Sequence, residues 1–114
     1  METMMKLFKH LNAAIVAADA DYKVIYQNDK SIEVFKMAFG TGDYIGKSIL
    51  DLHKPETSEK IKTHYQEYLE KKRNLYHYTM DGPNGKITIV NSPVYNESGE
   101  FDGVVEFIFD SSLA

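Results

Sequence analysis

Short apolar runs alternate with polar turn segments along this chain, and their periodicity predicts its secondary structure. Residues 2–11 carry apolar side chains at the spacing of one helical face, which predicts a short amphipathic helix within residues 1–11. The run "AAIVAAD" at 13–19 and the segment "KVIYQN" at 23–28 flank an Asp-rich turn. Two short strands around such a turn predict a β-hairpin.

The next segment has helical periodicity. Asn28 precedes "KSIEVFKMAF" in the position of an N-cap, where its side-chain oxygen can accept a backbone N–H. We expect the inward face of this helix to carry Ile32, Phe35 and either Met37 or Phe39.

A second, longer helix is predicted after a glycine-rich interruption. Glycines between residues 38 and 52 predict short helical turns and loop. Pro55 suits the first turn of the following helix, because its missing N–H costs nothing there. His53 lies just before this turn and is placed to satisfy a backbone group at the start of the helix. The helix runs to about residue 72, and its inward face carries Ile61, Tyr65, Tyr68 and Leu69.

The rest of the chain is predicted to be strand. "NLYHYTM" at 74–80, "GKITIVNSPV" at 85–94 and "DGVVEFIFD" at 102–110 are separated by the turn clusters "DGPNG" and "NESGEFDG". Strands at both ends with helices between them indicate an α+β fold, in which an antiparallel sheet is covered on one face by the helical segment.

Composition narrows the function classes. A chain of 114 residues is long enough for one domain with its own core. It has no cysteine, which excludes disulfides, thiolate zinc sites, iron–sulfur clusters and a cysteinyl adduct with a chromophore. The net charge of −4 and the lack of a basic cluster argue against direct binding to nucleic acid. We expect no membrane segment and a cytoplasmic location.

Four sequence patterns, in this order, resemble a PAS domain. They are "AAIVAADADYKVIYQND", "IGKSILDLHKPE", "NSPVYNESGE" and "FDGVVEFIFDSS". The resemblance implies a five-stranded antiparallel sheet of strand order 2-1-5-4-3, with helices packed over one face around a small cavity. It places a single PAS domain at residues 12–112, preceded by an N-terminal cap helix at residues 1–11.

The resemblance implies a sensor and signal-transduction module without catalytic residues. Such modules relay the state of their cavity to an output domain, for example a histidine kinase, a cyclic-di-nucleotide enzyme or a transcription regulator. In the family the signal leaves the domain through an Asp-x-Thr motif. Asp110, Ser111 and Ser112 occupy its place here, with Ser in place of Thr.

His64 raises the question of a haem ligand. It lies at the edge of the inward face of the second helix, and haem-binding members of the family carry their iron-ligating His on this helix. When the end of this helix, at Tyr68 and the following "EKK", is aligned with that of the haem-binding members, Ile61 takes the usual iron-ligand position and His64 lies one turn away. We therefore expect His64 to be a partly buried histidine beside the pocket, and we expect no haem and no metal site.

Strand alternation predicts two polar groups in the pocket. Glu106 shares strand parity with Ile108, and Asn91 shares it with Ile89. The family register turns these faces toward the cavity, where a carboxylate and an amide need partners. We expect His64 or a tyrosine within hydrogen-bonding distance of Glu106. The pocket candidates are Ile61, His64, Tyr68, Tyr76, Tyr78, Ile89, Asn91 and Glu106.

Two functional interpretations remain open, and a third has less support from the sequence. The first is a sensor that binds a small organic ligand, and the second is an interaction module that binds none because side chains fill the cavity. The small residues Ala14, Ala17, Ala18 and Gly103 favour an open cavity and hence the first. The third is a redox sensor with haem or a non-covalently bound flavin.

The last expectation is a homodimer. The alternate face of the final strand carries Phe107 and Phe109, which are too large and apolar to be left in water. Only the N-terminal helix is available to cover them, on its own sheet or on that of a second copy. The residues assigned to this contact are Met4, Leu7, Phe8, Leu11, Phe107 and Phe109.

Overall fold

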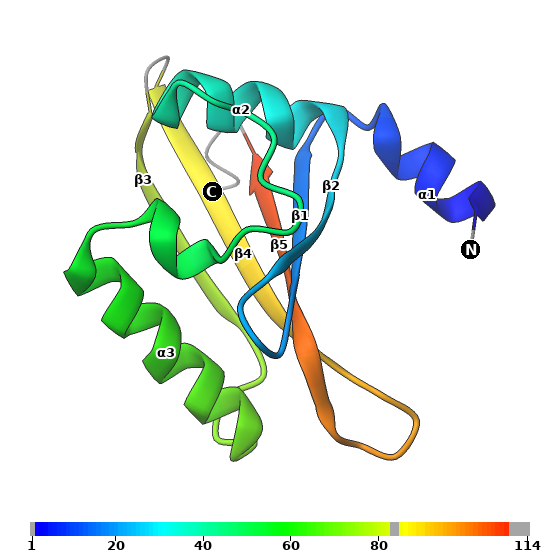
Figure 1. Ribbon diagram of the computed structural model, residues 1–114, viewed down its shortest axis with the longest axis vertical. Helices are drawn as coiled ribbons and strands as arrows, with labels where there is room; N and C mark the ends of the chain where they lie inside the picture. The colour runs from blue at the N-terminus through cyan, green and yellow to red at the C-terminus, as the bar shows by residue number, and fades with distance from the viewer. Residues whose placement is uncertain (1, 83–84, 110–114) are drawn as a thin grey trace.

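Five antiparallel strands form one sheet in the order β2-β1-β5-β4-β3, which confirms the predicted topology (Figure 1). The structure is a computed structural model, and it describes residues 2–82 and 85–109. Its elements are α1 (Glu2–Lys9), β1 (Ala14–Asp19), β2 (Val24–Gln27), α2 (Asp29–Phe39), the 3-10 helix η1 (Ile49–Leu52), α3 (Pro55–Leu69), β3 (Tyr76–Gly82), β4 (Gly85–Tyr95) and β5 (Phe101–Phe109). We call the face of the sheet against which α2 and α3 pack the inner face, and the opposite one the outer face.

The first hairpin forms where the Asp-rich turn predicted it. The Oδ1 atom of Asp19 accepts hydrogen bonds from the backbone N–H groups of Asp21 at 2.9 Å and Lys23 at 3.0 Å. These bonds replace ladder bonds that the turn cannot make, so the chain reverses direction between β1 and β2.

Helix α2 begins at the predicted cap but presents a different face. The side chain of Asn28 accepts from Ser31 N, as expected of an N-cap. Ser31 is buried and Phe35 packs into the core, whereas Ile32, Met37 and Phe39 are 36%, 59% and 42% exposed. The inward orientation predicted for Ile32 and for either Met37 or Phe39 is therefore wrong, although the ring of the exposed Phe39 contacts Phe35 and Tyr44. The cap explains the difference, because Asn28 also binds β1 and so turns the Ser31 side of the helix toward the sheet.

Helix α3 begins at Pro55, and two tyrosines form the centre of its buried face. Tyr65 is 6% and Tyr68 is 0% exposed, and Ile61 packs against the same cluster. Leu69 is 57% exposed, so its predicted inward orientation is wrong. With Tyr68 pointing straight at the sheet, the next residue of a helix lies about 100° around the axis and faces water.

Between the helices and the sheet, the core is built from the inner face of β1, β4 and β5. Its buried members on these strands are Ala14, Val16, Ala18, Ile89, Val104 and Ile108. Ala17 belongs to the outer face, because its neighbours along β1 point inward. A Cβ at Gly103 would lie 2.2 Å from the carbonyl oxygen of Ala18, so this glycine lets β5 approach β1 rather than opening a cavity.

Candidate functional site

Strand pairing brings three polar side chains into one row across the inner face. Tyr76 of β3 lies opposite Asn91 of β4, and Asn91 lies opposite Glu106 of β5. Glu106 in turn lies opposite Val16 of β1, whose side chain is buried in the core. The register sets Glu106 and Asn91 on the face of the sheet toward α3, in agreement with their strand parity. That they face a ligand cavity stays a prediction.

A hydrogen-bonded chain connects this row to α3. The hydroxyl of Tyr68 lies 2.7 Å from Asn91 Oδ1 and 3.0 Å from the Asn91 carbonyl oxygen. The Nδ2 group of Asn91 donates to Glu106 Oε2 at 3.2 Å. The expectation that His64 or a tyrosine binds Glu106 directly is wrong, because Asn91 stands between Glu106 and Tyr68. We call Tyr68, Asn91 and Glu106 the polar relay.

Burial dominates the electrostatics of the polar relay. It raises the pKa of Glu106, and the hydrogen bond from Asn91 opposes that rise. Burial also raises the pKa of Tyr65 and of Tyr68, and the charge of Glu106 adds to both. The same two causes raise the pKa of Tyr78 to about 12, although its side chain is 46% exposed. Tyr78 is therefore in contact with water and also interacts electrostatically with Glu106.

His64 belongs to a second cluster, beside the polar relay. Its ring stacks on that of Tyr76, with 3.7 Å between centroids and 17° between planes. The Tyr76 hydroxyl donates to a Glu67 carboxylate oxygen, and the Arg73 guanidinium lies 4.5 Å from the centre of the Tyr76 ring. Burial lowers the pKa of His64, so the imidazole is neutral in this stack at pH 7. Ile61 packs in the hydrophobic cluster of Tyr65 and Tyr68.

His53 does not cap α3, contrary to the expectation. It ends η1, and its ring meets the edge of Phe39 at 5.9 Å between centroids. Lys54 is the N-cap residue and makes no side-chain cap bond. The hydroxyl of Ser58 instead donates to the Leu50 carbonyl at 2.7 Å and fastens α3 to η1.

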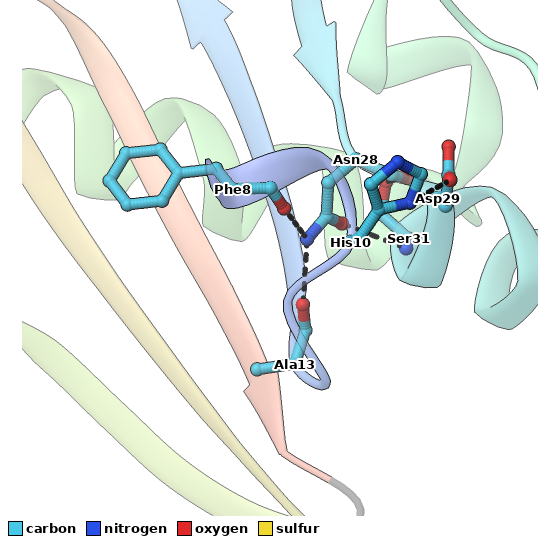
Figure 2. Close-up of polar contacts among 6 residues, drawn as sticks. All are labelled: Phe8, His10, Ala13, Asn28, Asp29 and Ser31. Atoms are coloured by element: carbon cyan, nitrogen blue, oxygen red, sulfur yellow. Dashed lines mark hydrogen bonds and ion pairs between the residues drawn. The ribbon is translucent and has the colours of Figure 1, made fainter. Parts of the chain in front are cut away.

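Asn28 has a larger role than its cap position indicated (Figure 2). It is 0% exposed, and its Oδ1 accepts from Ile15 N at 2.9 Å and Ser31 N at 3.0 Å. Its Nδ2 donates to the carbonyl oxygens of Phe8 at 2.9 Å and Ala13 at 2.8 Å. One amide thus joins the end of α1, the start of β1 and the first turn of α2. The bond to Phe8, at the end of α1, had no signal in the sequence.

The residues assigned to a dimer lie on two surfaces. Phe107 and Phe109 stack on the outer face, 6.4 Å apart and 9° from parallel. Helix α1 extends beyond the β2 edge of the sheet (Figure 1), and Leu7, Phe8 and Leu11 are 64%, 37% and 44% exposed. The side chain of Met4 lies outside the part of the chain that the structure describes.

The signal-output residues Asp110, Ser111 and Ser112 lie outside the described residues as well. The described chain approaches them along β5, which ends at Phe109.

Open hollows occur at α1 and α2. One of about 450 Å³ is lined by Lys6, Lys9, Tyr26, Gln27, Asp29 and Ile32. The predicted cavity lies instead between α3 and the sheet. There, Tyr65, Tyr68 and Tyr76 occupy much of the space. A ligand there must fit beside these rings.

Among the described residues, no three His, Asp or Glu side chains converge as a metal site would require. No described helix is both long and apolar enough to cross a membrane.

Comparison with known proteins gives a consistent family and fold. Residues 4–112 match the PAS domain family. The fold is similar to the C-terminal domain of a Streptococcus mutans protein, with a TM-score of 0.79, 22% identity, and 96% of this chain and 83% of that chain covered. A comparison with curated proteins finds no match.

Two further structures are similar. The PAS domain of Bordetella pertussis BvgS has a TM-score of 0.70 at 18% identity, with 97% of this chain and 85% of that chain covered. A sensory box sensor histidine kinase from Vibrio cholerae has a TM-score of 0.66 at 17% identity, with 99% and 92% covered. At these identities the likeness shows the fold.

Proposed function

This chain belongs to the PAS domain family, a family of sensory and signalling modules, and from that premise we propose that it senses a small molecule. The ligand binds between the inner face of the sheet and α3, in contact with the polar relay. The domain turns over nothing itself and acts in the cytoplasm, as part of a larger signalling protein.

The observation that carries this proposal is the polar relay itself. A carboxyl, an amide and a hydroxyl lie in one hydrogen-bonded chain between a sheet and a helix that are otherwise apolar there. Without partners such groups would cost on the order of 2–7 kcal/mol each to bury, and the hydrogen bonds between them offset that cost. A few convergent polar groups in an apolar setting are typical of sites that orient a small ligand.

The position of Glu106 supports a route for the signal. It lies on β5, the central strand, and β5 leads toward the Asp110–Ser112 segment that the family uses as its exit. A ligand that changes the hydrogen bonds of Glu106 shifts β5 and, through it, a partner domain. A sensory box histidine kinase among the similar structures makes a kinase a suitable output domain for this proposal.

The test is ligand binding that depends on the polar relay. Purified protein is screened against a small-metabolite library by thermal shift, and each hit is checked by native mass spectrometry. We expect at least one hit with 1:1 stoichiometry that Asn91→Leu abolishes and that Asn96→Leu, at an exposed turn residue, does not. Hits that survive Asn91→Leu would place the ligand elsewhere and refute this site.

The exposed apolar surface supports a second function, protein–protein interaction without a ligand. Leu7 and Leu11 of the N-terminal segment are largely exposed, and the tyrosines occupy much of the interior. Under this function the screen returns no hit and the chain self-associates or binds a partner through the N-terminal segment.

A further inference from the structure

The carboxyl group of Glu106 has one oxygen engaged and one open. Its Oε2 accepts the hydrogen bond from Asn91, and its Oε1 has no hydrogen-bond partner among the described residues. In the same part of the chain, every side-chain oxygen or nitrogen that is sealed from water has a partner. Oε1 is therefore not completely sealed, although Glu106 as a whole is deeply buried.

No cationic side chain of residues 2–82 and 85–109 forms an ion pair with this carboxyl. The ion pairs of the described residues lie at the surface, for example between Lys62 and Glu59, and none of them includes Glu106. The groups that sense the charge of Glu106 are instead aromatic: Tyr65 and Tyr68 of α3 and Tyr78 of β3. The site thus combines an open carboxylate oxygen with electron-rich rings.

We propose that the ligand of this site is a small organic cation, a protonated amine that donates an N–H to Glu106 Oε1 among the rings of Tyr65, Tyr68 and Tyr78. This inference rests on the proposed function, because it names the chemical class of ligand for the same site. An ammonium group supplies both things that Glu106 lacks, namely a donor for Oε1 and a positive charge.

The chemistry of the surroundings favours a cation over other ligands. Between α3 and the sheet, charges are poorly screened, so an anion is repelled by the carboxylate and a neutral donor leaves its charge uncompensated. Tyrosine rings attract cations through their negative faces, and carboxylates do so more strongly through charge.

Tyr78 supplies the way in. It lies on β3, at the edge of the sheet, with its side chain 46% exposed. Strand pairing sets Tyr78 opposite Ile89, two positions from Asn91 on the inner face, so a molecule that enters at this edge passes Tyr78 on its way to Glu106.

The experiment compares charged and neutral molecules of the same shape. Isobutylamine is paired with isobutanol, and benzylamine with benzyl alcohol, and each is titrated at pH 8 into the full chain while amide NMR shifts are followed. We expect each amine to bind about tenfold tighter or more than its alcohol, the scale of one charge-assisted bond. The largest shift changes are expected at the polar relay and Tyr78.

Two variants and one control make the result specific. Glu106→Gln keeps the shape of the side chain and an oxygen for Asn91, and it should remove the preference for amines. Tyr78→Leu, at a half-exposed edge position, should reduce that preference about threefold. Glu97→Gln, at an exposed turn residue, should leave it unchanged.

Each outcome decides the matter. Alcohols that bind as tightly as amines, or a preference that survives Glu106→Gln, would overturn the cation inference and leave the ligand site standing. Binding of neither series at the polar relay would overturn the cation inference, and with an empty metabolite screen it would overturn the proposed function too.

Discussion

At the scale of single residues, Glu106 should make the stability of this protein depend on pH. Its pKa is 4.5 in the unfolded chain and is raised in the folded one. As pH rises above 4.5, the unfolded state releases the proton first, so the free energy of unfolding falls until the pH passes the folded pKa. Each unit of difference between the two pKa values corresponds to about 1.4 kcal/mol.

Glu106→Gln removes this dependence, because glutamine does not titrate. We expect the free energy of unfolding of the variant, relative to that of the wild type, to rise between pH 4 and pH 8, as measured by urea unfolding. Tyr65, Tyr68 and Tyr78 face the same space, but their raised pKa values keep them neutral over this range. A stability difference that stays constant with pH would show that Glu106 is ionised alike in both states.

Asn28 should be among the costliest residues to replace. Asn28→Ala removes one hydrogen bond from each of two backbone N–H groups and two carbonyls, and Asn28 itself is 0% exposed. We expect a loss of about 3 kcal/mol or more in the free energy of unfolding.

The matched control is Asn96→Ala. Asn96 also accepts two backbone N–H groups, from Ser98 and Glu100, but in an exposed turn where water can replace it. It should lose only about 1 kcal/mol. Equal losses in the two variants would mean that burial of the Asn28 bonds adds nothing.

At the scale of elements, the stack of His64 on Tyr76 ties α3 to β3. Its imidazole is held in the stack on Tyr76, so we predict that the protein, expressed with added haem precursor and purified, shows no Soret band that depends on His64. His64→Ala should cost about 1 kcal/mol through the lost stacking. A Soret band near full occupancy that His64→Ala abolishes would contradict this.

Strand faces were predictable from the sequence, whereas helix faces were less so. In β5, a slip of one residue would turn Glu106 and Ile108 outward together with their whole row, so alternation fixes the register strongly. In α2 the apolar residues Ile32 and Met37 suggested one face, but a bond from Asn28 to β1 sets another. That bond spans 13 residues and leaves no mark on periodicity.

The candidate site was predictable in its members but not in its connections. Parity placed Asn91 and Glu106 together, since both follow from the family register. The order Tyr68–Asn91–Glu106 depends on side-chain reach across α3 and β4, which no pattern in the sequence encodes.

At the scale of the whole molecule, the exposed apolar residues of the N-terminal segment predict association. Leu7, on a helix of only eight residues, is 64% exposed, and Leu11, two residues beyond its end, is 44% exposed, which is costly unless something covers them. We expect size-exclusion chromatography with light scattering to show a homodimer at micromolar concentration, and a chain that starts at Asn12 to be monomeric.

Two results would separate the parts of this prediction. A wild-type monomer would refute the dimer. A dimer that persists in the shortened chain would instead assign the contact to the sheet, for which Phe107→Ser is the next variant because Phe107 lies on the outer face.

The shared oxygen of Asn28 has a consequence for amide hydrogen exchange. The N–H groups of Ile15 and Ser31 are bonded to one Oδ1 atom, although they lie 16 positions apart in the chain. Neither proton can reach deuterium by the movement of that side chain without exposing the other. Their exchange rates should therefore rise together as denaturant is added. Exchange at these two amides then reports when the N-terminal segment detaches from the rest of the fold.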